Sequence, residues 1–456
     1  MASNVKKEKN VSEKKASSGI IAGFLQHGSI DIIFLIIVLF LLGAGLIMMF
    51  SASYPSSYAE TGTSTYYIKK QAIGAVVGLV VMFGLSIIKT DFWKNPWILN
   101  PIAIGSYVLL ALVLATGDGD IKRWIYIGSF SFQPSELSKF AIVLIGAYLY
   151  SKHYTKISSN RIYKQGIVGR INVFLAEKIN KKGGRIYLHE GWIPTIYHVF
   201  FFMSTALFVA KGSHLSAFII MCLIGGAMMF FGGVRMRWFV SVALVAVVAV
   251  AIVCVPVKMT VDEKNELIAA GELSKGEEAD NYVVENVKIP FIKGYQVKRI
   301  IAWIDKDYSP QGSRWQQNQG LYAVGSGGFF GKGLGNSTQK YLYVSEPHND
   351  MIFTIVCEEL GFFGAAIIII AFAFLVYRGF SIGMNARTRF GGLLAMGLSL
   401  LIGMQALLNI AVATELIPNT GISMPFFSYG GTALIVYLAE AGIVLSVSRD
   451  SRMSKK

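Results

Sequence analysis

The stretch SEPHNDMIFTIVCEELGFFGA, residues 345–365, joins a polar head to an apolar body. The head holds Glu346, His348 and Asp350, and the body carries Glu358 and Glu359 side by side. A long apolar run is typical of a membrane-spanning helix, in which ionisable groups are costly and mark functional sites. The stretch therefore predicts a transmembrane helix with a site at its first end. At least one of the two inner glutamates must face a protein partner or a water-filled cavity.

The composition of the whole chain agrees with a membrane protein. Of 456 residues, 54% are hydrophobic and only 15% are charged, too few for the polar exterior of a soluble protein. Several apolar runs reach the length of about 18–20 residues that spans a bilayer core as a helix. We therefore expect an all-α polytopic membrane protein with ten transmembrane helices. The predicted spans are 32–50, 71–88, 97–117, 135–150, 191–210, 213–233, 238–257, 350–377, 390–412 and 430–448.

The distribution of Lys and Arg predicts the orientation. An even number of spans puts both termini on one side, and the basic residues gather in the tails and short loops of that side. By the positive-inside rule both termini are cytoplasmic, and the net charge of +15 reflects topology, not a nucleic-acid partner. Residues 1–29 form a basic cytoplasmic tail too far from the first span to be a signal peptide. Residues 449–456 form a second cytoplasmic tail.

Two longer segments lie between these spans. Spans one to seven occupy 30–257 and include a basic cytoplasmic loop, 151–190, with an amphipathic helix suited to an anionic leaflet. Residues 258–349 form a long extracellular loop between spans seven and eight, and residues 350–448 hold spans eight to ten. The first half of the extracellular loop is acidic and expected to be solvated.

The second half of the extracellular loop has a helical pattern and a glycine cluster. Val297, Ile300, Ile301 and Ile304 recur at helical spacing, which predicts a short amphipathic helix at the membrane surface. The cluster between residues 325 and 335 predicts a close-packed turn, and it lacks the GxxxxGK[ST] spacing of a nucleotide-binding loop. Three cysteines fall inside apolar spans, as small buried residues do, and encode no disulfide framework or zinc site.

Three polar stretches fall on the external side of this topology: 120–144, 345–365 and 413–435. The third has the composition of a re-entrant or broken helix, whose backbone must be satisfied inside the bundle. Together they predict an outward-facing polar cavity for a charged, partly lipidic ligand. Cations there suit a phosphate or pyrophosphate group, and a carboxylate suits proton abstraction from a hydroxyl.

The same stretches resemble the signatures of the shape, elongation, division and sporulation family, the RodA/FtsW/SpoVE group. The resemblance lies in KRWIYIGSFSFQPSELSKFAIVL, GLGNSTQKYLYVSEPHNDMIFTIVCEELGFFGA and NTGISMPFFSYGG, in the family's order. It departs from the family at Ser345, where Pro is usual, and at Asn349, where Thr is usual. Upstream, Ser309 and Arg314 replace the usual Asp and Gly.

The resemblance implies a function and a partner. Members of this family are peptidoglycan glycosyltransferases, which polymerise lipid II at the outer face of the bacterial cytoplasmic membrane. They work with a class B penicillin-binding protein, a transpeptidase. The resemblance thus implies lipid II and membrane lipids as ligands. It leaves open a divalent cation such as Mg²⁺ or Mn²⁺, and an elongation, division or sporulation role.

The resemblance also implies site residues. The family's essential aspartate falls on Asp350, and the glutamate of the same motif falls on Glu346, two residues before His348. The tryptophan of its RW motif falls on Trp124, which we expect to pack against a sugar face. The Glu and Lys of its QPSELxK motif fall on Glu136 and Lys139.

Each of these residues has a chemical role in our hypothesis. Asp350 is the expected base. Lys122, Arg123 and Lys139 are the candidate pyrophosphate stabilisers, with Glu136 orienting Lys139. Two other functions remain open from the residues: a flippase for lipid-linked precursors, since an outward polar cavity also suits transport, and a non-catalytic scaffold.

Overall fold

The computed structural model describes most of the chain. The described residues are 29–116, 123–127, 130–158, 165–166, 169–170, 172–174, 190–212, 214–274, 276–287, 294–309, 312 and 314–453. The predicted amphipathic helix of the loop 151–190 lies largely outside them, as do most of the N-terminal tail and the last three residues.

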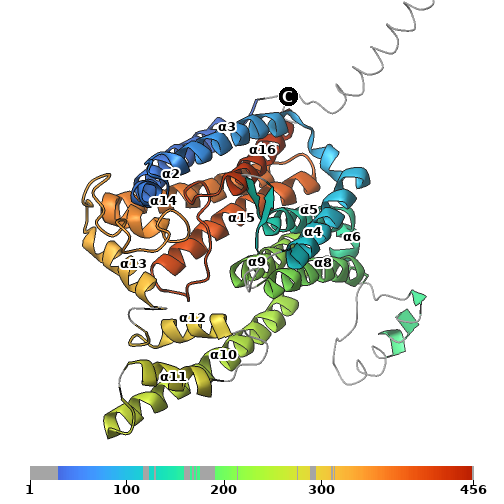
Figure 1. Ribbon diagram of the computed structural model, residues 1–456. Coiled ribbons are helices and arrows are strands. Elements are labelled where there is room, and N and C mark those ends of the chain that lie inside the picture. Colours follow the sequence, from blue (N-terminus) through green and yellow to red (C-terminus); the bar gives the residue numbers. More distant parts are fainter. Residues whose placement is uncertain are drawn as a thin grey trace, which may run out of the picture.

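The fold is a bundle of long helices (Figure 1). Its helices are α2 (Ile32–Thr61), α3 (Tyr66–Ile87), α4 (Pro96–Thr116), α5 (Pro134–Lys152), α8 (Trp192–Lys211), α9 (Leu215–Gly232), α10 (Met236–Ala270), α14 (Ile352–Met384), α15 (Arg389–Ala413) and α16 (Gly431–Met453). The shorter elements are η1 (Thr90–Lys94), β1 (Ile125–Ile127), β2 (Phe130–Phe132), α6 (Tyr154–Ser158), α11 (Glu277–Asn286), α12 (Gly294–Ile304) and α13 (Trp315–Ser326).

Eight helices within the described residues are long and apolar enough to cross a membrane, namely α2, α3, α4, α8, α9, α14, α15 and α16. The predictions 135–150 and 238–257 also coincide with helices, α5 and α10. The chain is therefore a multi-pass membrane protein. The two further crossings and the orientation remain predictions.

Buried polar groups join helices that are distant in sequence. Gln71 of α3 is fully buried; its side chain donates to the Ser428 carbonyl at 3.1 Å and accepts from the Gly430 amide at 3.0 Å. The Ser446 hydroxyl of α16 donates to the Ile88 carbonyl at 2.5 Å. These bonds fix α3 along α16 and hold the turn before α16.

A short antiparallel hairpin interrupts the helical pattern, which the all-α expectation did not include. In it β1 pairs with β2, and Tyr126 lies opposite Ser131. The Thr432 hydroxyl of α16 donates to the Ser131 carbonyl at 2.6 Å. The hairpin therefore holds residues 123–124, which lie directly before β1, close to the start of α16.

The first half of the long loop folds into helices. α10 continues as far as Ala270, and α11 and α12 pack against its distal part (Figure 1). Val261 of α10, Val283 of α11 and Ile301 of α12 belong to a second hydrophobic core, separate from that of the bundle. The predicted helix around Val297–Ile304 is confirmed as α12, but its apolar residues pack on protein. We call α10 beyond Val257 together with α11 and α12 the helical subdomain.

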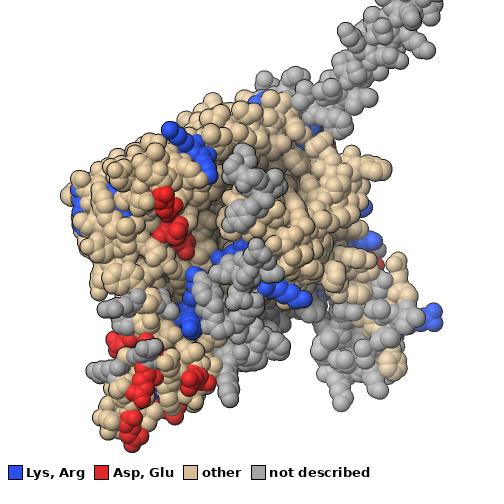
Figure 2. All heavy atoms as spheres, in the orientation of Figure 1, with Lys and Arg blue, Asp and Glu red and all other residues tan. Residues whose placement is uncertain are grey.

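The helical subdomain keeps its acidic residues at the surface and one ion pair in its interior. Asp262, Glu263 and Glu266 are exposed, and Figure 2 shows acidic side chains gathered over this part of the molecule. Lys264 and Asp305 are buried and pair at 2.6 Å. Since α10 carries Lys264 and Asp305 follows α12, the pair fixes one helix against the other.

Removal of the Lys264 charge should open the helical subdomain. In Lys264→Met the Asp305 carboxylate stays buried without its cation, which costs about 3–5 kcal/mol. We expect faster amide hydrogen exchange in α11 and α12, with α14 to α16 unchanged. Lys258→Met, an exposed lysine of the same helix, is the control, and equal exchange in the two variants would contradict a stabilising role for the pair.

Candidate functional site

Asp350 lies two residues before α14, at the end of the irregular segment 327–351. Three main-chain acceptors fix its position. Its own carbonyl accepts from the side-chain amide of Asn409, a residue of α15, at 2.7 Å. The Asn349 carbonyl accepts from the Ser428 hydroxyl at 2.6 Å, and the His348 carbonyl accepts from the Tyr429 amide at 2.8 Å. The second and third polar stretches of the sequence are thus in direct contact.

The segment 414–430, which connects α15 to α16, has no helix and is largely buried. This agrees with the predicted broken or re-entrant character of residues 413–435. Its backbone is satisfied by side chains: the Asn409 amide also donates to the Ile422 carbonyl at 2.6 Å, and the Ser428 hydroxyl accepts from the Met424 amide at 2.7 Å. The irregular segment therefore supplies a fixed wall beside Asp350.

Two arginines meet Asp350 at Gly421 of this wall. A Cβ on Gly421 would lie 3.6 Å from Asp350 Oδ2, 3.6 Å from Arg123 Nη1 and 3.8 Å from Arg299 Nη1. Gly421 also has φ +72°, a conformation that side chains disfavour. Glycine here leaves the three charged groups facing one small space. The first polar stretch of the sequence reaches this space through Arg123.

Arg299 was missed by the sequence analysis. It projects from α12, and its Nη1 donates to the Asn419 carbonyl at 3.0 Å. Two further contacts join the same region to segment 414–430: the Trp303 indole donates to the Glu415 carbonyl at 2.9 Å, and Arg314 pairs with the Glu415 carboxylate at 3.2 Å. The helical subdomain thus contributes a cation to the site.

The environment of Asp350 acts on its pKa in two directions. Burial raises the pKa of the Asp350 carboxyl above its ordinary value, while the nearby Arg299 and Arg123 guanidinium groups oppose the rise. A desolvated carboxyl beside cations that favour its ionised form is suited to accept a proton.

The other residues predicted beside Asp350 have different surroundings. Trp124 is half-buried next to Arg123, whereas Lys122 lies outside the described residues. Glu346 is exposed, and its carboxylate accepts from the Asn349 side-chain amide at 2.8 Å. Partial desolvation of the carboxyl and then the charges of Glu60 and Asp350 raise its pKa.

His348 is buried between two tyrosine rings. Its ring centroid lies 4.4 Å from that of Tyr67 and 5.8 Å from that of Tyr429. Burial lowers the pKa of His348 to about 4, so the imidazole is neutral at physiological pH. His348 therefore packs between these rings and adds no positive charge near Asp350.

Glu136 and Lys139 lie inside the bundle. They pair at 2.7 Å, and the Lys139 ammonium also donates to Gln405 of α15. The Tyr437 hydroxyl of α16 donates to the same Gln405 oxygen at 3.4 Å, and Glu440 is buried on that helix. Lys139, 2% exposed, thus joins α5 to α15 and α16 from within.

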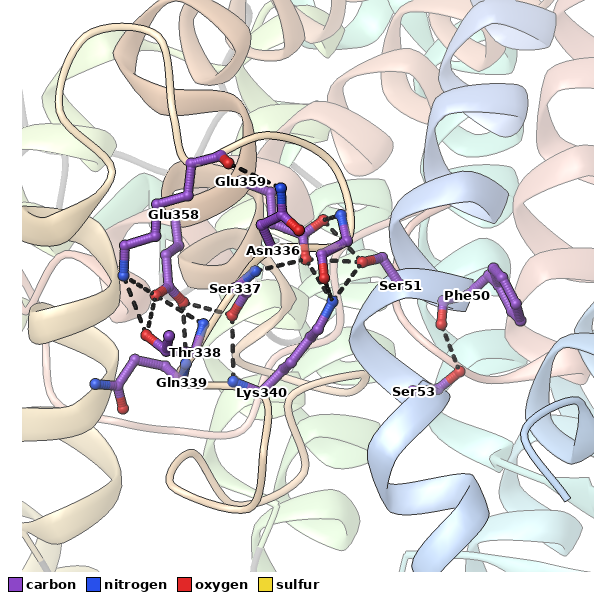
Figure 3. A network of polar contacts seen from close by, with 12 residues as sticks. Phe50, Ser51, Ser53, Asn336, Ser337, Thr338, Gln339, Lys340, Glu358 and Glu359 are labelled. Carbon is purple, nitrogen blue, oxygen red and sulfur yellow. Dashed lines mark hydrogen bonds and ion pairs between the residues drawn. The ribbon is translucent and has the colours of Figure 1, made fainter.

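Glu358 and Glu359 are both fully buried, whereas the sequence required this of at least one of them. They face the segment 326–340, which contains all of the glycine cluster except Gly325 (Figure 3). Among the described residues, no group of three or more His, Cys, Asp or Glu side chains is placed to hold a metal ion.

Comparisons with known proteins agree on one family. The FtsW/RodA/SpoVE family model, described as cell cycle protein, matches residues 32–453. Stage V sporulation protein E of Bacillus subtilis is 32% identical over 92% of this chain and 98% of its own. The probable peptidoglycan glycosyltransferase FtsW of Trichlorobacter lovleyi is 31% identical over 93% of this chain and 94% of its own.

A solved structure has the same fold. It is a chain of a peptidoglycan synthase complex that coordinates polymerization and crosslinking. It aligns with a TM-score of 0.62 at 19% identity, over 93% of this chain and 98% of that one.

The surroundings of His348 predict its titration. Because burial lowers the pKa of His348 to about 4, its ring should stay neutral as the pH falls to 5. In the unfolded chain the same ring takes up its proton near pH 6.5. His348 therefore lowers the free energy of unfolding as the pH falls from about 6.5 towards 4. Nitrogen-15 NMR of histidine-labelled protein, with His348→Gln to assign the signal, measures this. A ring that titrates above pH 6 would show that the packing is wrong.

Proposed function

The chain belongs to the FtsW/RodA/SpoVE family, and we propose that it is a peptidoglycan glycosyltransferase that polymerises lipid II into glycan strands. The names of its relatives support this activity. The observation that carries the proposal for this chain is the meeting of Asp350, Arg123 and Arg299 around Gly421, because a carboxylate beside two cations suits a reaction with a hydroxyl nucleophile and an anionic leaving group.

The reaction joins two sugars. In our proposal the Asp350 carboxylate accepts the proton of the 4-hydroxyl on the acceptor sugar. The hydroxyl oxygen forms a bond to the anomeric carbon of the donor, and the bond from that carbon to undecaprenyl pyrophosphate breaks. The pyrophosphate leaves with the electron pair, and the proton on Asp350 passes to solvent. Positioned general-base catalysis of this kind contributes roughly 10²–10⁴-fold.

The leaving group requires positive charge. We assign Arg123 and Arg299 to the pyrophosphate, since guanidinium groups bind phosphate oxygens in a planar, two-pronged arrangement. Lys122 and Lys139 complete the cation set that we propose from the sequence. Lys139 is bound to Glu136 and Gln405, and in our proposal it adds its charge from inside the bundle while it holds α5 in position. Trp124 is proposed to pack against a sugar ring.

We propose that the reaction takes place at the outer face of the membrane. We propose that α5 and α10 cross the bilayer with the eight other helices, which gives ten spans and cytoplasmic termini. Asp350, at the beginning of α14, then faces the outside of the bacterial cytoplasmic membrane, where lipid II is used. A class B penicillin-binding protein is the proposed partner, and the fold shared with a chain of a peptidoglycan synthase complex supports it.

Replacement of Asp350 tests the activity. Purified protein with its class B partner, the transpeptidase blocked by penicillin, should convert lipid II into glycan chains. We expect Asp350→Asn to make none, because the amide cannot accept the proton while the main-chain contacts of residue 350 remain. Chains from neither protein, in an intact complex, would favour the flippase. Chains from both would remove Asp350 from the centre of the mechanism.

Replacement of Arg299 tests the cation pair. Arg299→Gln should lower kcat by roughly 10²-fold, the typical loss when one charge-stabilising group is removed. The acid limb of the pH profile of kcat/KM should also move to higher pH, since Arg299 opposes the rise in the Asp350 pKa. Lys298→Gln, an exposed neighbour on α12, is the matched control. Equal rates in the two variants would exclude Arg299 from the site.

A further inference from the structure

Helix α14 is interrupted where its two glutamates lie. Gly361 has φ +67° and ψ −170°, values that only glycine adopts readily. The Glu358 and Glu359 carbonyls accept from the Lys332 and Gly333 amides at 2.9 and 3.0 Å. On the other side of the break, the Phe362 and Phe363 amides donate to the Gly328 and Phe329 carbonyls at 2.9 and 3.0 Å. Residues 327–340, the inserted loop, thus take over the hydrogen bonds that the interrupted helix lacks.

Within the described part of the chain, the Glu358 carboxylate binds the inserted loop and Ser326 at the end of α13. It pairs with Lys332 at 2.5 Å, and it accepts from the Ser337 and Thr338 hydroxyls at 2.5 and 2.8 Å. Lys332 is 31% exposed, so this pair lies at the outer side of the loop. Glu358 therefore closes the loop on itself.

The Glu359 carboxylate joins three separate parts of the chain (Figure 3). It pairs with Lys340 at 2.9 Å and accepts from the Ser51 hydroxyl of α2 at 2.7 Å and from the Gly335 amide at 3.0 Å. The Lys340 ammonium also donates to Ser51 Oγ at 3.1 Å and to the Gly335 carbonyl at 2.7 Å. Glu359, Lys340 and Ser51, which we call the internal clamp, tie α14, the inserted loop and α2 together.

The internal clamp lies at one end of the ten residues that lead to Asp350. Between Lys340 and Asp350 the chain has no helix or strand, and side chains of α13 bind its carbonyls. The Trp315 indole donates to the Tyr343 carbonyl and the Gln316 amide donates to the Ser345 carbonyl, both at 2.9 Å. Leu342 is held at φ +66° within this stretch, a conformation that persists only where the surroundings impose it.

We propose that Glu359 is a positioning residue for Asp350, acting through its ion pair with Lys340. The clamp sets where the segment 341–350 begins, and Asn409, Ser428 and Tyr429 set where it ends. When the ion pair between Glu359 and Lys340 is lost, the first end of the segment 341–350 is no longer held in place. Asp350 then moves relative to Arg123 and Arg299. The inference rests on the proposed function for its kinetic readout and on the fold alone for its exchange readout.

The kinetic test compares the native protein, Glu359→Gln, Lys332→Met and a double variant described below in the lipid II assay. Glu359→Gln should lower kcat by roughly 10–100-fold, the cost of misplacing a reacting group by about 1 Å, with KM little changed. Its kcat/KM profile should show an acid limb moved to higher pH, because Asp350 leaves its arginines. Lys332→Met breaks the other ion pair but leaves the buried Glu358 carboxylate its hydrogen bonds from Ser337 and Thr338, none of which involves residues 341–350. It should therefore keep kcat within about fivefold of the native value.

A double variant separates positioning from stability. Glu359→Gln leaves the Lys340 ammonium buried beside a neutral group, so part of its effect could come from misfolding. Glu359→Gln with Lys340→Met removes both charges and should regain the thermal stability of the native protein but not its kcat. Recovery of both would overturn the proposal and make Glu359 a purely structural residue.

Amide hydrogen exchange tests the inference without the reaction. We expect faster exchange across residues 341–350 in Glu359→Gln and in the double variant, and native exchange in Lys332→Met. Native exchange in all three variants would overturn the proposal, whatever the kinetics. If the native protein makes no glycan while the exchange changes as expected, the proposed function fails and the positioning by Glu359 stands.

Discussion

Inside a lipid bilayer a polar group must find its hydrogen-bond partner within the protein, because the surrounding hydrocarbon offers none. The irregular parts of this structure follow from that constraint. In the segment 414–430, the side chains of Asn409 and Ser428 form hydrogen bonds with backbone groups. At the break in helix α14, backbone groups of the inserted loop do the same. A lysine faces Glu359, and another faces Glu136, so each buried carboxylate of these pairs has a cation. The bundle can therefore carry non-helical chain next to Asp350.

In this arrangement the groups that hold the backbone near Asp350 are not the groups that carry the charges of the candidate site. The main-chain carbonyls around Asp350 are bound by Asn409, Ser428 and Tyr429, so no carboxylate or guanidinium of the site is needed to hold the segment. The side chains of Asp350, Arg123 and Arg299 remain directed at the space over Gly421. A site that is held by its backbone can present unlike charges to a substrate with little reorganisation, which is the condition for electrostatic stabilisation of a transition state.

The sequence predicted the features that depend on local pattern. Apolar length located the helices, helical spacing found α12, and the cost of intramembrane charge drew attention to Asp350, Glu136 and Lys139. It missed Arg299, because a basic residue on an amphipathic helix looks like any solvated lysine or arginine until the partner of that helix is known. The sequence did not predict that the first half of the loop folds into helices: most of its described acidic residues are exposed as expected, but α10 and α11 share a core with α12 that single-sequence periodicity does not reveal.

Single-sequence periodicity also does not predict that Glu358 and Glu359 are both buried. Adjacent residues of a regular helix point in different directions, so the sequence required at least one of Glu358 and Glu359 to face inward and could not predict that both do. Both are inside because the inserted loop surrounds this turn of α14 just before the break at Gly361. The glycine cluster between residues 325 and 335 predicts a close-packed turn. Nothing in its spacing indicates that this turn pairs with the break in a helix.

The placement of Arg299 has a consequence for how this architecture can diversify. One face of α12 belongs to the core of the helical subdomain, and its arginine belongs to the site. Trp303 and Arg314 fasten the same region to the segment 414–430. The helical subdomain is therefore not a module that recombination could exchange by itself. A functional chimera between relatives would have to inherit α10 to α13 together with the connection between α15 and α16, as a single block drawn from two distant parts of the gene.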